Sequence, residues 1–297
     1  MPLDRVTHNM IANTFQADLS EIFGRLQKVH EQLSSGRRIR RPSDDPPAVI
    51  QAVSLRSALQ LNDQFLRTIN LSKTWMDTSE GALAVLTNAL ARARELAVQG
   101  ANGTLTTADR QNIGKEVDQL LGAAVSATNT SSVGAYIFAG HKTTTTPFAV
   151  AASVVTYSGD AGQMSREIGS GLQLAINVTG DVPTASLKSV LEALVLLRDD
   201  LNAGNQVAVA ADLGTVDTAI ETVLRLRAEV GAKINRFDFT EERLQDVQLA
   251  LTRLLSETQD VDMAETITRF QLEENVYKAA LNAGSRAIQP SLLDFMR

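Results

Sequence analysis

The feature that most constrains the fold is a strict apolar repeat near the start of the chain. Its members recur at alternating spacings of three and four residues, at Leu19, Ile22, Leu26, Val29 and Leu33. This heptad pattern is typical of a helix that packs along its length against a partner helix. Burying each apolar side chain contributes at most roughly 1.5–3 kcal/mol, whereas ordering each backbone residue costs about 1–2 kcal/mol. We therefore expect helix 18–35 to be stable only against a partner.

The repeat is followed by a stop and a restart. Gly36 can adopt the positive φ that ends a helix, and a polar link containing Arg37 and Arg38 comes next. An aspartate can accept hydrogen bonds from the free N–H groups of a new helix, and proline is tolerated in its first turn. The residues that we assign to the link and cap are Gly36, Arg37, Arg38, Asp44, Asp45 and Pro46.

The basic cluster of this link, Arg37 to Arg41, has two main interpretations. It is either a solvated link balanced by the neighbouring aspartates, or a patch that forms salt bridges between subunits. Phosphate binding ranks third, because no aromatic stacking residues lie nearby in the sequence.

The remaining chain reads as long helices around a β-rich insertion. One helical pattern runs from 45 to about 99, and one of its heptad registers holds Ile69 and Met76 but also Lys73 and Glu80. Thr106 with Asp109 has the spacing of a capping box, which predicts a further helix. Glycine-punctuated, β-branched residues then predict strands between about 140 and 183. Helical patterns resume afterwards and continue to the end of the chain.

The order of these segments is nearly palindromic, which favours a chain that folds back on itself at the insertion. We predict a mainly α protein, an elongated antiparallel helical bundle or coiled-coil rod with its N- and C-terminal helices paired, plus a small β-rich insertion domain. The predicted divisions are a coiled-coil helix and link at 1–44, a long-helix rod at 45–139 and 184–258, the insertion at 140–183, and a C-terminal coiled-coil helix at 259–297.

The two outer helices lack a wider bundle that would bury their seams. We therefore expect an assembly of copies to complete them, while the seams of the long helices form an internal bundle core. The predicted assembly seam combines the five residues of the opening repeat with an apolar series near the C-terminus. That series is Met263, Ile267, Phe270, Tyr277, Leu281, Ile288, Leu292 and Phe295.

Composition excludes several classes of protein. Apolar residues make up 44% of the chain and aromatic residues only 4%, so the core must be aliphatic, as suits close-packed helices. A net charge of −6 argues against a nucleic-acid binder, and the absence of cysteine excludes disulfides. Asp4 and Arg5 interrupt the apolar run that a cleaved signal peptide needs, and no stretch approaches the roughly 18 apolar residues of a membrane span. We expect neither nucleic-acid binding nor membrane insertion.

No catalytic pattern is evident. His30 and Glu31 begin like the zinc-protease helix motif, but Ser34 stands where the second histidine is required. Nothing in the sequence brings His8 or His141 close to that position, and no phosphate loop, nucleophile elbow or dinucleotide fingerprint occurs. We expect no catalytic centre, no metal and no cofactor.

Four stretches resemble the bacterial flagellin superfamily. They are LSSGRRIRRPSDDPP at 33–47, LARARELAVQGANG at 90–103, DRQNIGKEV at 109–117, and the C-terminal region from 262 to 295. The RPSDDP variant and the C-terminal region are more similar to the branch whose members join hook to filament than to filament flagellins. Filament flagellin stays the alternative.

The resemblance implies a structural subunit of the bacterial flagellum. It also implies export of the unfolded chain through the flagellar type III apparatus, with a cytosolic export chaperone keeping it soluble, and hence an extracellular location. The implied partners are other copies of the chain in a ring, a neighbouring hook-associated protein, and flagellin.

Overall fold

The computed structural model describes residues 8–180 and 186–288 of the 297-residue chain. The chain divides into two compact units. The first consists of Met1–Gln60 and Gln248–Arg297, and the second of Leu61–Val247.

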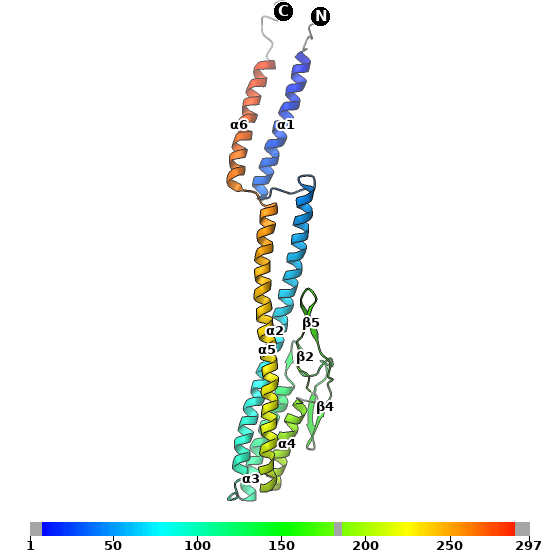
Figure 1. Cartoon of the computed structure of the whole chain (residues 1–297), viewed down its shortest axis with the longest axis vertical. Coiled ribbons are helices and arrows are strands. Elements are labelled where there is room, and N and C mark those ends of the chain that lie inside the picture. The colour runs from blue at the N-terminus through cyan, green and yellow to red at the C-terminus, as the bar shows by residue number, and fades with distance from the viewer. Residues whose placement is uncertain (1–7, 181–185, 289–297) are drawn as a thin grey trace, which may run out of the picture. The chain divides into compact units, whose positions relative to one another are not determined.

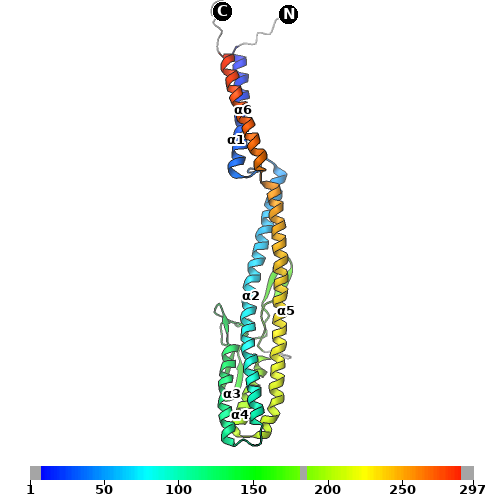
Figure 2. The ribbon, with the colours of Figure 1, turned by 90° about the vertical axis from the view of Figure 1, so that its left-hand side faces the viewer.

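In the first unit, the two terminal helices lie side by side. Helix α1 (His8–Ser35) runs antiparallel to α6 (Met263–Ile288), as both views show (Figures 1 and 2). The start of α2 (Pro46–Gly100) and the end of α5 (Gln206–Gln259) complete this unit. The predicted pairing of the N- and C-terminal helices is confirmed, although α1 begins ten residues earlier than the apolar repeat suggested.

The second unit packs the remaining parts of α2 and α5 with α3 (Thr107–Thr128) and α4 (Leu187–Ala203). The predicted capping box is present, since the Thr106 side chain accepts from the Asp109 N–H and the Asp109 carboxylate accepts from the Thr106 N–H. Gly204, at φ 68°, ends α4 and lets the chain turn directly into α5. A continuous aliphatic core joins the four helices, with Leu83, Leu90 and Leu194 fully buried.

The buried seam of α2 corrects half of the predicted register. Ile69 and Met76 are fully buried, as expected, but the alternate seam positions are Ser72 and Ser79 rather than Lys73 and Glu80. Each serine hydroxyl has a hydrogen-bond partner within its own helix, one turn earlier. Ser72 donates to the Thr68 carbonyl at 2.6 Å, and Ser79 donates to the Trp75 carbonyl at 2.9 Å. The charged residues lie on the flank of the seam and pair with α5.

These flank contacts form a ladder of ion pairs between α2 and α5. Its members are Lys73–Asp238 (2.6 Å), Lys73–Glu241 (2.9 Å), Glu80–Arg227 (2.5 Å) and Arg94–Asp217 (2.5 Å). Two acidic partners raise the pKa of Lys73 to about 12, chiefly through its hydrogen bond to Asp238. Charges beside an apolar seam fix which helices pair and in which register.

Within the described part of the chain, the β-rich region contains three antiparallel hairpins. Their strands are β1 (Ser131–Ser132), β2 (Ala135–Tyr136), β3 (Phe148–Ala151), β4 (Val154–Tyr157), β5 (Ser165–Gly169) and β6 (Leu172–Ala175), paired β1–β2, β3–β4 and β5–β6. Buried Phe148 packs on Tyr157 at 5.0 Å between ring centroids, and the Tyr157 hydroxyl donates to the Phe138 carbonyl at 2.9 Å. The mainly α fold with a small β insertion is therefore confirmed, although strands begin at Ser131, ahead of residue 140.

None of the helices within the described residues is long and apolar enough to cross a membrane.

Candidate assembly surface

The predicted seam of α1 lies on the face of this helix that meets α6. Val29 is buried there and the four other repeat residues, Leu19, Ile22, Leu26 and Leu33, are half-buried. Beside this seam, Phe23 contacts Tyr277 of α6 at 5.8 Å between ring centroids, and His30 contacts Phe270 at 5.9 Å.

On α6 the structure separates the predicted seam residues into two groups. Phe270 and Tyr277 are half-buried against α1, whereas Met263, Ile267 and Leu281 expose 47%, 45% and 42% of their surface. Leu292 and Phe295 lie outside the described residues. Ile288 is the last residue of α6, and nothing further is described of it.

The face of α6 that does meet α1 includes residues that an apolar pattern misses. Thr266 and Gly284 are buried there, and Glu273 pairs with Arg25 of α1 at 3.4 Å. A Cβ on Gly284 would lie 2.0 Å from the Phe15 ring, so any larger residue would force this aromatic side chain to move. The signal that could have found Phe15 is its position four residues before the repeat.

The link after α1 pairs with the short connection between α5 and α6. Gly36 has a φ of 67°, as predicted for a helix stop, and its carbonyl accepts from the Val261 N–H at 3.1 Å. The N–H of Arg38 donates to the Gln259 carbonyl at 2.8 Å, and Arg37 forms a β-bridge with Asp260. These backbone contacts join the link between α1 and α2 to the connection between α5 and α6.

The two aspartates of the link have different roles. Asp45 caps α2, because its carboxylate accepts from the Ala48 N–H at 3.2 Å and Pro46 is the first helical residue. Asp44 instead orders the link, accepting from the N–H groups of Arg41 and Arg40 at 3.0 and 3.1 Å. These backbone hydrogen bonds, that from Arg41 first, hold the pKa of Asp44 below its usual value.

Large apolar side chains remain exposed over much of the first unit. Besides the three exposed seam residues of α6, the exposed set includes Met10, Phe23, Ile50, Val53, Leu249, Leu254, Leu272 and Val276. On α6, Leu272 and Val276 lie on the opposite flank from Met263 and Ile267, so the helix presents apolar surface on both sides of its contact with α1. Exposed apolar surface of this extent marks a site of interaction with another protein.

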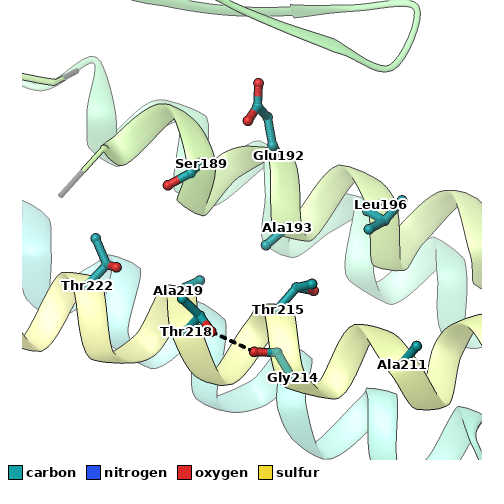
Figure 3. Close-up of a pocket in the computed structure, with 10 residues that line it drawn as sticks. All are labelled: Ser189, Glu192, Ala193, Leu196, Ala211, Gly214, Thr215, Thr218, Ala219 and Thr222. Carbon is teal, nitrogen blue, oxygen red and sulfur yellow. Dashed lines mark hydrogen bonds between the residues drawn. The ribbon is translucent and has the colours of Figure 1, made fainter. Parts of the chain in front are cut away.

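A hollow in the second unit offers no comparable chemistry. It has a volume of about 580 Å³ and lies between α4 and α5 (Figure 3). Its walls are mostly small side chains, including Ala193, Gly214 and Thr218, and Glu192 is the one titratable side chain among its lining residues. The Glu192 carboxylate points away from α5. This arrangement provides no acid–base pair and no set of metal ligands.

Comparison with known proteins identifies the family. The model of the bacterial flagellin N-terminal helical region matches residues 6–143, and that of the C-terminal helical region matches residues 213–296. The chain belongs to the bacterial flagellin family. The first match includes α1 and α2, the second includes most of α5 and all of α6, and the β-rich region falls mostly between the two matches.

Relatives within the flagellin family match nearly the whole chain. Flagellar hook-associated protein 3 of Escherichia coli is 30% identical over 86% of this chain and 88% of its own length. The flagellar filament 33 kDa core protein of Treponema phagedenis is 29% identical over 98% of this chain and 99% of its own. The crystal structure of Bacillus cereus FlgL shares the fold, with a TM-score of 0.61 and 24% identity, covering 68% of this chain and 99% of that one.

The flagellin assignment confirms the resemblance noted in the sequence. It makes this chain a flagellin-like structural component of the bacterial flagellum, and it supports the prediction that the protein is not an enzyme.

Proposed function

We propose that this protein is the subunit that joins the flagellar hook to the filament. Its similarity to hook-associated protein 3 supports the junction role. The observation that carries the assembly mechanism is the exposed apolar surface of α6, formed by Met263, Ile267 and Leu281 beside the helix pair. Apolar side chains on both flanks of one helix require neighbours on both sides, as subunits in a closed ring provide.

The same proposal assigns a part to each segment. Residues 1–44 and 259–297 make the contacts between copies, residues 45–139 and 184–258 form the supporting long-helix part, and residues 140–183 form the insertion. The partners are further copies of this chain, a neighbouring hook-associated protein and flagellin. The chain reaches its extracellular position by flagellar type III export, with a cytosolic chaperone covering its apolar terminal segments.

A filament subunit is the second candidate, because the Treponema relative at 29% identity is a filament core protein. Deleting the gene from its own bacterium distinguishes the two functions. Loss of a junction subunit leaves bare hooks while flagellin accumulates unpolymerised in the medium. Loss of a filament subunit leaves hooks without any flagellin in the medium, and this result would overturn the junction proposal. Complementation with the intact gene should restore filaments and is the control.

A further inference from the structure

A basic pocket lies on the face of α1 that points away from α6. It has a volume of about 250 Å³ and is lined by Lys28 and Glu31 of α1 and by Arg38, Arg40, Arg41 and Asp44 of the link. All of these residues belong to the first unit. Lys28 and Glu31 lie on the opposite side of α1 from Leu26 and Val29, so the paired helix α6 of the same chain does not cover the pocket.

The charges in the basic pocket are not balanced. Four cationic side chains line it, but only two carboxylates, and the ion pairs formed are long. Lys28 Nζ lies 3.6 Å from Asp44, and Arg40 Nη1 lies 3.5 Å from Glu31. Arg38 has partners outside the lining, since its Nη1 lies 3.8 Å from Asp45 and its Nη2 donates to the Thr258 carbonyl at 2.9 Å. The guanidinium of Arg41 has no ion pair among the contacts of the described residues, while Asp44 is already occupied by two backbone N–H groups. The Arg41 guanidinium is therefore available for a further carboxylate, which the more weakly paired Lys28 and Arg40 would also face.

The helix face beside the pocket is shaped for close approach by another helix. Small residues follow one another along it, at Ala17, Ser20 and Gly24, and the series ends in the pocket lining. A Cβ on Gly24 would meet nothing within 4 Å, so this surface is open. A pocket that requires a carboxylate, at the end of a smooth helix face, fits a helix that carries an acidic side chain.

Helix α6 has a flank with this character. Its exposed apolar residues Met263, Ile267 and Leu281 share one side of the helix with Glu274, which interrupts the apolar series near its middle. Glu274 now pairs with Lys278 of the same helix at 2.6 Å, and the two side chains are 42% and 62% exposed. A solvated pair of this kind contributes little and can be exchanged for a better one.

The register between α1 and α6 places Glu274 and the basic pocket at the same height along the helix pair. His30 lies beside Phe270. Phe23 lies beside Tyr277. Glu274 is therefore level with the stretch of α1 from which the pocket opens. In the closed ring that the proposed function assumes, copies stand at one height, and the α6 of a neighbouring copy then passes α1 in this same antiparallel register.

We propose that the basic pocket receives the Glu274 carboxylate from α6 of a second copy of this chain. The contact rests on the proposed assembly function, because it requires copies side by side. It would fix the rotational position of each subunit, while the apolar flanks provide most of the buried surface.

Cysteine cross-linking tests the contact in the assembled organelle. Since the natural chain has no cysteine, a variant with Lys28→Cys and a differently tagged variant with Glu274→Cys are co-expressed in the deletion strain, and flagella are isolated under mild oxidation. A covalent dimer that carries both tags is expected. The matched control replaces Glu274→Cys by Ala279→Cys on the opposite side of α6, and it should give far less of the dimer.

Charge reversal provides the second measurement. Arg41→Glu and Glu274→Arg should each lower the incorporation of the chain into flagella, by up to about fivefold for the loss of one ion pair at each interface. The double variant should restore incorporation. Arg253→Glu, an exposed change elsewhere in the first unit, is the control.

The possible failures are distinguishable. Flagella that contain the chain but give no mixed dimer would overturn the Glu274 contact and leave the assembly function intact. A chain that is absent from flagella altogether would overturn both.

Discussion

Asp212 is a buried acid at a core position of α5, and replacing it should stabilise the second unit. Only 3% of its surface is exposed, and its Oδ2 atom has no hydrogen-bond partner among the described residues. It occupies the heptad position between Val209 and Val216, both fully buried. Burial first, and then the neighbouring Asp200 carboxylate, raise the pKa of Asp212 from 3.8 to about 6.

The direction of the effect follows from proton linkage. Between about pH 4 and pH 6 the folded protein keeps a proton on Asp212 that the unfolded chain releases, so the free energy of unfolding falls as the pH rises. A pKa raised by about two units lowers the free energy of unfolding by at most about 3 kcal/mol. This destabilisation is complete above pH 6, where Asp212 is ionised in the folded protein, and it is absent below pH 4. Asp212→Asn removes the charge and should raise the free energy of unfolding at pH 7 by up to about 3 kcal/mol.

Urea unfolding measures this directly, with the fluorescence of Trp75, the one tryptophan of the chain, as a probe within the second unit. The gain from Asp212→Asn should shrink steadily from pH 7 to pH 4.5. Glu221→Gln, an exposed change on the same helix, should stay within about 0.5 kcal/mol of the natural protein at both pH values. The reasoning is refuted if Asp212→Asn fails to stabilise at pH 7, or if its effect is independent of pH.

Three other substitutions test separate parts of the structure. Gly284→Ala places a methyl group against Phe15 and should destabilise the α1–α6 pair by about 1–3 kcal/mol, seen as lower helical signal in circular dichroism; an unchanged signal would contradict the packing described. Ala152→Asn, in a hairpin turn where Ala152 and Ser153 both have positive φ, should stabilise the second unit by about 0.5–1 kcal/mol, measured by urea unfolding, and a loss of stability would argue against that turn. Leu26→Asp should leave the Trp75 unfolding transition unchanged but abolish incorporation into flagella, and normal incorporation would show that the α1 seam is not needed for assembly.

The sequence predicted the helices well because their start and stop signals are local. The capping box at Thr106 and the positive φ at Gly36 depend on neighbouring residues only, and both appear as expected. The predicted register of the α2 seam was half wrong, because apolar character alone does not decide which residues are buried. Ser72 can be buried, since its hydroxyl bonds to its own helix, while Lys73 is more stable on the flank, where α5 supplies two carboxylates.

Apolar spacing was also an incomplete guide to the candidate assembly surface. On α1 the apolar repeat and the face toward α6 coincide, so the residues could be named from spacing alone. On α6 the face toward α1 uses Thr266, Glu273 and Gly284, whose roles depend on particular partners across the helix pair. The basic pocket could not be located from the sequence, because it forms only when the link folds back against α1.

Hydrogen–deuterium exchange tests most directly whether neighbouring copies complete the terminal helices. It should be measured on the full-length monomer and on the same chain in isolated flagella. In the monomer, the amides of α1 and α6 should exchange far faster than those of α3 and α4, since an isolated pair of helices is marginally stable. In flagella they should become strongly protected. Terminal helices as protected in the monomer as the core of the second unit would contradict the proposed assembly mechanism.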